Sequence, residues 1–131
     1  MTAAPQDRPR IMLVDDHPGV LRAISRLLDP DCEIVASMED GARAIESAVR
    51  LKPDVMVVDL SMPDMDGLEV CRRMQKAAPE TDVIILTAYE DEQVEAAAIQ
   101  AGAASFVAKH AASSTLLGVI QRMVEKKRVR T

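Results

Sequence analysis

The chain has 131 residues, of which 48% are hydrophobic and 28% charged, a composition typical of one soluble globular domain. The formal net charge of −5 argues against nucleic-acid binding, which usually requires a basic surface. No stretch reaches the roughly 20 apolar residues of a membrane span, no secretory signal is recognisable, and the two cysteines lack metal-binding spacing, so we expect a cytoplasmic protein with reduced thiols.

Five short apolar runs alternate with segments of helical pattern along the chain. Continuous apolar runs rich in β-branched residues are typical of parallel strands that are buried on both faces. The predicted strands are Ile11–Val14, Glu33–Ala36, Val55–Val58, Val83–Leu86 and Ser105–Ala108.

The segments between and after these runs carry apolar residues at helical spacing, which predicts amphipathic helices. The fourth helix, within Glu92–Ala101, has only Val94 and Ile99 as bulky apolar residues, so we expect it to be the most loosely packed. The apolar positions of the other four are Val20, Leu21, Ile24, Leu27 and Leu28; Ala42, Ile45, Ala48 and Val49; Leu68, Cys71 and Met74; and Leu116, Leu117, Ile120, Met123 and Val124.

Residues that favour helix ends agree with this division. Pro18 suits the first turn of the first helix. Gly102 is suited to end the fourth helix. Ser113 or Ser114 can cap the last one.

Successive β–α units predict an α/β fold, a five-stranded parallel doubly wound sheet with five helices on its two faces. The common strand order is 2-1-3-4-5, and ligands bind such sheets at the carboxyl ends of the strands, beside the reversal between strands 1 and 3. We expect residues 10–124 to form this domain. Residues 1–9 are then a disordered tail, and residues 125–131 a basic tail or the start of a linker.

Polar side chains follow four of the predicted strands. Carboxylates gathered at one point resist ionisation unless positive charge offsets them. Oxygen ligands favour a hard ion such as Mg²⁺, and a lysine supplies a second positive charge. The residues are Asp15 and Asp16 after strand 1, Asp59 after strand 3, Thr87 after strand 4 and Lys109 after strand 5.

This arrangement suits phosphoryl transfer, in which catalysis is mostly positioning and charge neutralisation. Asp59 would be the nucleophile, Lys109 a point charge and Thr87 a hydroxyl donor. Ala88 is small and leaves the approach to the nucleophile open. Tyr89 is placed either to limit the access of water or to be a solvated loop residue.

Four segments together form a recognisable pattern: Ile11–Asp16, Val57–Gly67, Leu86–Ala88 and Phe106–Lys109. The second segment reads D-L-S-M-P-D-M-D-G from Asp59. The pattern resembles the receiver domain of two-component response regulators and covers nearly the whole chain. It implies a flavodoxin-like or CheY-like fold, phosphorelay signalling and Mg²⁺ as cofactor.

The resemblance implies a role for each residue of the site. Asp59 would be the phosphoacceptor, taking phosphate from a sensor histidine kinase or a phosphotransfer protein. Asp16 and Asp59 would ligate Mg²⁺ through their carboxylates, Ser61 through its backbone carbonyl, and Asp15 largely through water. The protein would then be no enzyme in the metabolic sense, because it would catalyse only its own phosphorylation and dephosphorylation.

A conformational switch is also implied. Thr87 would move toward the phosphoryl group, and Phe106 would turn inward behind it. The face formed by the fourth helix, the fifth strand and the last helix would then bind a second copy of the chain or an output partner. We therefore expect a homodimer that depends on phosphorylation.

Two features, one of them a departure from the common pattern, indicate a subfamily. Asp15-Asp16-His17-Pro18 and His110, where most receivers have proline, resemble the NarL/FixJ group, whose full-length members bind DNA through a C-terminal helix-turn-helix. We interpret both histidines as loop residues rather than ligands and leave the isomer of the Lys109–His110 bond open. We expect either a receiver cut from a longer transcription regulator or a stand-alone receiver, and we favour the first. DNA would then be bound only through an output domain absent from this sequence.

Other functions fit less well. A receiver-like module that interacts without phosphate would not need the complete set of site residues. A phosphatase of the haloacid-dehalogenase kind also forms an aspartyl phosphate, but it needs an acid two residues after the nucleophile, where Ser61 stands. A flavodoxin would need a Ser/Thr-rich phosphate loop after the first strand.

Overall fold

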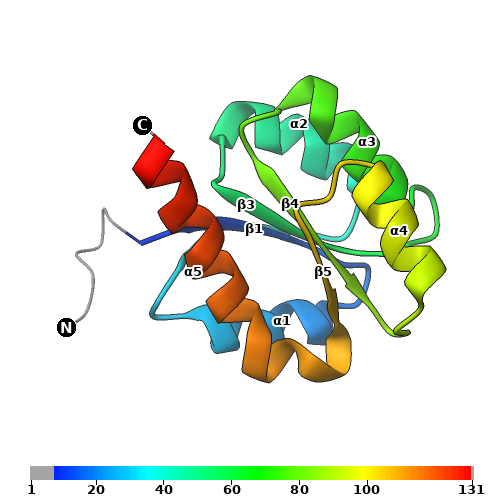
Figure 1. The fold of residues 1–131 in the computed structure, drawn as a ribbon, viewed down its shortest axis with the longest axis horizontal. Helices are drawn as coiled ribbons and strands as arrows, with labels where there is room; N and C mark the ends of the chain where they lie inside the picture. Colours follow the sequence, from blue (N-terminus) through cyan, green and yellow to red (C-terminus); the bar gives the residue numbers. More distant parts are fainter. Residues whose placement is uncertain (1–7, 131) are drawn as a thin grey trace.

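The computed structural model describes residues 8–130, so most of the predicted N-terminal tail, residues 1–9, lies outside the described residues. The strands form one parallel sheet in the order β2-β1-β3-β4-β5, which confirms the predicted α/β fold (Figure 1). The strands are β1 (Arg10–Val14), β2 (Glu33–Met38), β3 (Val55–Asp59), β4 (Asp82–Thr87) and β5 (Ser105–Ala108). The helices are α1 (Pro18–Leu28), α2 (Gly41–Leu51), α3 (Gly67–Ala77), α4 (Glu92–Gln100) and α5 (Ala112–Arg130), with a short 3₁₀ turn, η2 (Lys109–Ala111).

Alternate side chains of the central strands enter two separate cores, because successive residues of a strand point to opposite faces of the sheet. Helices α1 and α5 cover one face and α2, α3 and α4 cover the other (Figure 1). The first core contains Ile11, Leu13, Val55, Val57, Ile84 and Leu86, and the second contains Met12, Val14, Met56, Val58, Val83 and Ile85.

The two cysteines are buried and free, as the sequence predicts. Cys32 belongs to the core under α1 and α5, and Cys71 to the core on the opposite face of the sheet. Burial raises the pKa of each thiol to about 11, so both remain protonated at neutral pH.

The predicted apolar face of α2 is partly wrong. Helix α2 approaches α3 so closely that a Cβ on Gly41 would lie 2.8 Å from Cγ2 of Val70. Small residues of α2 therefore face inward, and the spacing of its larger apolar residues does not identify the buried face. The buried positions are Gly41, Ala44, Ser47 and Ala48, whereas Ala42 and Val49 are exposed.

Helix α4 is held by little apolar packing. Ala98 is its one buried residue, and Ile99 is 54% exposed. Gly102 follows the helix with φ of 106°, a left-handed conformation that glycine tolerates and that ends helices. The predicted loose packing of this helix and its predicted end therefore agree with the structure.

The junction between β5 and α5 differs from the predicted cap. Because η2 leads directly into the helix at Ala112, Ser113 and Ser114 lie inside its first turn. Ser114 Oγ donates a hydrogen bond of 3.1 Å to the carbonyl of Ala111 rather than accepting one as a cap. The Lys109–His110 bond is trans, since the cis peptide bond found in residues 8–130 is Asp29–Pro30.

Residues 125–130 continue α5. The Nζ atom of Lys127 donates to the carbonyl oxygens of Asp54, at 2.8 Å, and Glu80, at 2.6 Å, and lies 3.3 Å from Oδ2 of Asp82. These contacts hold the last turns of α5 against the loops that precede β3 and β4. Of the helices in the part of the chain that the structure describes, none has the length and apolarity to cross a membrane.

Candidate functional site

The acidic residues predicted from the sequence meet at one edge of the sheet. Val14 of β1 pairs with Val58 of β3, so the residues that follow them, Asp15 and Asp59, emerge side by side. Carboxylate oxygens of Asp15, Asp16 and Asp59 and a ring nitrogen of His17 all lie within 4.8 Å of one another. The carboxyl ends of β1 and β3 therefore form an acidic cluster at the point where the strand order reverses.

Lys109 reaches this cluster from the far side of β4. The strand pairing places Ala108 beside Thr87, and the next residue extends its long side chain back toward β3. The Nζ atom lies 3.1 Å from Oδ1 of Asp59 and 3.3 Å from Oδ2 of Asp15. One ammonium group thus faces two carboxylates that are almost completely buried.

Burial governs the electrostatics of the central carboxylate. Burial raises the pKa of Asp59 above its ordinary value, and the charge of Asp15 raises it further. Hydrogen bonds from Lys109 and from the backbone of Ser61 only partly offset this effect. The ionised Asp59 therefore remains under-compensated, and an additional cation beside it would stabilise it.

The pKa of Lys109 is also raised, but for a different reason. Burial alone lowers the pKa of Lys109, but the hydrogen bond to Asp59 and the charges of Asp59 and Asp15 outweigh it, so the pKa is raised above its ordinary value. The side chain is consequently a fixed positive charge at neutral pH. It balances one carboxylate of the cluster and leaves the others to a further cation.

The carboxylate oxygens themselves are suited to a metal ion. Oδ1 of Asp16 is buried, yet it accepts no hydrogen bond from any residue in the described part of the chain, and Oδ2 of Asp15 has only the ammonium of Lys109, at 3.3 Å, as a partner within residues 8–130. Buried polar atoms are normally hydrogen-bonded or coordinated to a cation. A set of carboxylate oxygens, with the carbonyl of the nearby Ser61, fits the hard ion Mg²⁺.

The loop from β3 to α3 is fixed by Gly67. Its N–H donates to the carbonyl of Leu60 at 2.9 Å. A Cβ on this glycine would lie 2.7 Å from the carbonyl oxygen of Asp59 and 2.9 Å from Cα of Leu60. Since both neighbours are backbone atoms, only glycine fits, and the start of α3 determines where the strand that carries Asp59 ends.

Thr87 is buried at the end of β4, and its hydroxyl bonds within its own loop. Oγ1 donates to the carbonyl of Tyr89 at 3.0 Å and accepts from the N–H of the same residue at 3.1 Å. No hydrogen bond joins Thr87 to Asp59 within residues 8–130. Ala88 and Tyr89 are exposed, the tyrosine to 75%.

Phe106 is half-buried and packs against the core on the side of α4. It also lines a hollow of about 370 Å³ together with acidic residues at the start of that helix. These residues are Glu90, Asp91, Glu92 and Glu95.

His17 lies in the loop before α1, as predicted, and its ring is directed toward the acidic cluster. Its Nδ1 atom lies 3.1 Å from Oδ1 of Asp15 and 3.1 Å from Oδ1 of Asp16, so the imidazole belongs to the acidic cluster. Adjacency to the two aspartates was the available signal, but the direction of a loop side chain does not follow from spacing. His110 lies apart, with Nε2 at 3.2 Å from Oε1 of Glu90.

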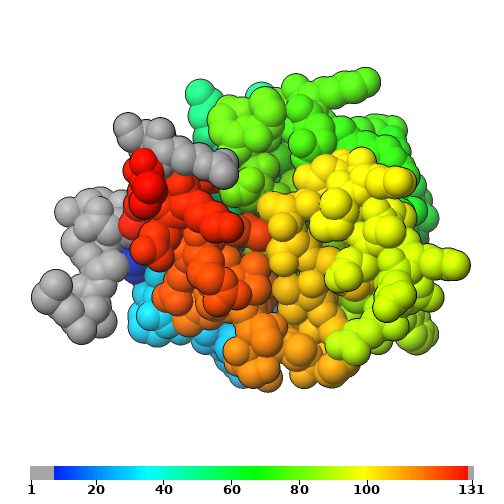
Figure 2. Space-filling model, viewed as in Figure 1, coloured from blue at the N-terminus to red at the C-terminus, as the bar shows by residue number. Residues whose placement is uncertain are grey.

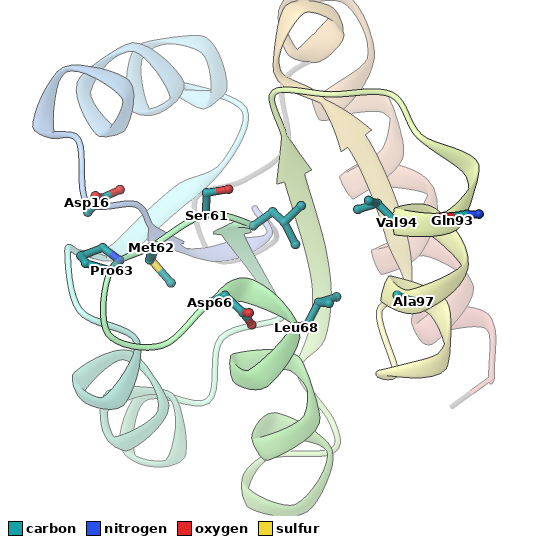
Figure 3. Close-up of a pocket in the computed structure, with 10 residues that line it drawn as sticks. Asp16, Ser61, Met62, Pro63, Asp66, Leu68, Gln93, Val94 and Ala97 are labelled. Atoms are coloured by element: carbon teal, nitrogen blue, oxygen red, sulfur yellow. The ribbon is translucent and has the colours of Figure 1, made fainter.

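A pocket of about 790 Å³ opens beside the cluster (Figure 3). Asp16 and residues of the loop after β3 form one wall, and residues of α4 form the opposite wall. A group that approaches the cluster from this side therefore also meets the weakly packed helix. The lining comprises Asp16, Leu60, Ser61, Met62, Pro63, Asp66, Leu68, Gln93, Val94 and Ala97.

Comparison with known proteins identifies the family. The sequence matches the response regulator receiver domain over residues 11–121. It is 36% identical over 111 residues to the oxygen regulatory protein NreC of Staphylococcus haemolyticus, covering 82% of this chain and 51% of that protein. It is 32% identical over 114 residues to the transcriptional regulatory protein LiaR of Bacillus subtilis, covering 86% of this chain and 54% of that protein.

Solved structures agree. A LuxR-family two-component response regulator from Aurantimonas sp. superposes with a TM-score of 0.86 at 30% identity, covering 92% of this chain and 87% of that one. The signal receiver domain of a NarL response regulator from Mycobacterium tuberculosis superposes with a TM-score of 0.84 at 28% identity, covering 90% of this chain and 97% of that one.

The chain belongs to the response regulator receiver domain family, and its relatives are regulators of the NarL and LuxR type, as the sequence pattern predicts. Receiver domains of this family are signalling domains of two-component systems that bind Mg²⁺ at an acidic pocket. The chain spans about half the length of the curated relatives it matches.

Proposed function

We propose that this protein accepts a phosphoryl group on Asp59 from a histidine kinase or a phosphotransfer protein and relays that event by changing shape. The observation that carries the proposal is the ammonium of Lys109, 3.1 Å from Oδ1 of Asp59, inside a cluster of three carboxylates. The charge balance of the cluster requires a further cation, and the donor set fits Mg²⁺.

The reaction follows from this charge distribution. A carboxylate oxygen of Asp59 attacks the phosphorus of the donor, and the bond between that phosphorus and the donor's leaving atom breaks. Lys109 neutralises charge on the phosphoryl oxygens and holds them near the carboxylate. When bound by Asp16, Asp59 and the Ser61 carbonyl, with Asp15 acting through water, Mg²⁺ would supply further positive charge to the same oxygens.

Incubation with acetyl phosphate tests the proposal. With Mg²⁺ present, the intact mass of the wild-type chain is expected to increase by one phosphoryl group. The increase should vanish for Asp59→Asn and for wild-type protein in excess chelator. A stable mass gain in Asp59→Asn would place the chemistry on another residue.

We further propose that phosphorylation moves Thr87 and Phe106. The Thr87 hydroxyl would give up its bond to the Tyr89 carbonyl and donate to a phosphoryl oxygen instead. That exchange would shift the loop that starts α4, a helix with one buried residue, and would let the half-buried Phe106 turn inward. Ala88 and Tyr89 would control how readily water reaches the phosphoryl group.

The output of this switch is then the face of α4, β5 and α5. Figure 2 shows it, with α4 in yellow and α5 in orange to red. We propose that it binds a second copy of the chain and that output controls transcription through a DNA-binding domain, because the relatives include transcriptional regulators. Hydrogen exchange in α4 and β5 is expected to change when beryllofluoride, a phosphoryl mimic, binds; identical exchange would contradict the switch.

A further inference from the structure

The imidazole of His17 is directed into the acidic cluster, although a residue at this position in the fold usually caps the following helix. His17 is the N-cap residue of α1, where a side chain usually bonds to the first free N–H groups of the helix. Its side chain makes no such bond. Instead Nδ1 faces Oδ1 of Asp15 and Oδ1 of Asp16, at 3.1 Å from each.

These distances match the spacing of ligands around one metal ion. Two ligands on adjacent corners of an octahedron with bonds of about 2.1 Å lie about 3.0 Å apart. The Nδ1 atom thus has, from Oδ1 of Asp16, the separation that neighbouring ligands of one ion would have. With the ring proton on Nε2, Nδ1 carries a lone pair that can bind a cation.

A buried carboxylate oxygen beside the imidazole gives an independent indication of a ligand. Oδ1 of Asp16 is buried and accepts no hydrogen bond within residues 8–130, and the Asp15 side chain, 3% exposed, has its Oδ2 atom 3.3 Å from the ammonium of Lys109. The other oxygen of Asp15 is oriented by the N–H of His17, which donates to Oδ1 at 2.8 Å. His17 therefore orients the buried carboxylate of Asp15 and also presents a ring nitrogen beside it. The side chain of His17 is 64% exposed, so an ion can reach it from solvent.

We propose that Nδ1 of His17 is an additional ligand of the divalent-cation site, which gives the site a mixed nitrogen and oxygen donor set. Carboxylate and carbonyl oxygens suit Mg²⁺, whereas imidazole favours borderline transition ions such as Ni²⁺. The site then accepts Ni²⁺ in preference to Mg²⁺ by a margin that depends on His17. This inference rests on the proposed function for the location of the site, but not on phosphoryl transfer.

Calorimetric titration of the chain without a histidine tag, with Ni²⁺ and Mg²⁺ in turn, tests the inference. In His17→Asn, Ni²⁺ affinity is expected to fall about tenfold or more, while Mg²⁺ affinity changes much less. His110→Asn is the matched control, because its ring is similarly exposed, at 68%, but pairs with Glu90. It should leave both affinities unchanged, and Asp16→Asn should weaken both ions together.

Each alternative outcome is informative. Equal losses of affinity for the two ions in His17→Asn would contradict the preference for Ni²⁺ that the inference assigns to His17, and no change would show that the imidazole is no ligand. Ni²⁺ binding that survives Asp16→Asn would locate this ion at a separate surface histidine and overturn the inference. Absence of Mg²⁺ binding in the wild type would instead remove the cation site that the proposed function requires, whereas retained Mg²⁺ binding without a His17 effect would leave that function intact.

Discussion

Replacing Lys109 by methionine is expected to slow phosphorylation from acetyl phosphate by about 100-fold or more, the usual cost of removing one group that stabilises transition-state charge. Methionine keeps most of the side-chain length but carries no charge. The ammonium lies 3.1 Å from Oδ1 of Asp59 and 3.3 Å from Oδ2 of Asp15, so its loss leaves two buried carboxylates without their common cation. Intact mass measured over time gives the rate.

The control for this variant is Lys126→Met, which removes a lysine from the exposed surface of α5. It should react at the wild-type rate. Cooperative thermal unfolding of Lys109→Met, with a midpoint that still rises when Mg²⁺ is added, would show that the fold and the cation site persist. A wild-type rate in such a folded variant would contradict the role of Lys109.

Substitution of Gly67 by alanine is expected to have a comparable effect for a different reason. The new Cβ would lie 2.7 Å from the carbonyl oxygen of Asp59, and backbone atoms cannot rotate away. Strain of this kind typically costs about 1–3 kcal/mol. Because displacement of a catalytic group by about 1 Å can cost about 100-fold in rate, phosphorylation should slow to that extent.

Gly118→Ala is the matched control for this substitution. Gly118 lies within α5, and a Cβ there would have the flexible end of Arg122 as its nearest neighbour, at 3.5 Å. Because alanine is favoured over glycine in helices, this variant should be more stable by up to about 1 kcal/mol and react normally. Denaturant unfolding and the phosphorylation rate, measured on both variants, check the pair. If Gly67→Ala retained wild-type stability and rate, the close fit of the loop to β3 would have no functional consequence.

Much of the fold follows from local patterns in the sequence. The apolar runs located all five strands, with ends that differ by at most two residues: β2 continues to Met38, for example, where the run was expected to end at Ala36. The strand order follows from the alternation of strands and helices, because right-handed crossovers leave few arrangements. The face of α2 could not be predicted in this way, because it depends on how closely α3 approaches.

The far end of α5 shows the limit of local reasoning. Its last turns carry an exposed Val129, 81% accessible, and no apolar stripe. They are held by Lys127, which binds carbonyls 73 and 47 residues away in sequence. Contacts across such separations leave no periodic signal.

The candidate site was partly predictable from the order of the strands. Residues at the ends of neighbouring parallel strands must meet, so Asp15, Asp59 and Lys109 were expected together and lie together. The direction of a loop side chain is set by three-dimensional contacts. The imidazole of His17 and the loop-directed hydroxyl of Thr87 therefore required the structure.

Mapping of the phosphoryl group tests the central claim most directly. Borohydride reduces an acyl phosphate to an alcohol, so a phosphorylated aspartate becomes homoserine and can be located by peptide mass spectrometry. After reaction with acetyl phosphate and Mg²⁺, homoserine is expected at position 59 and at no other aspartate. Homoserine at position 15 or 16, or its complete absence from a protein that has gained phosphoryl mass, would contradict the account.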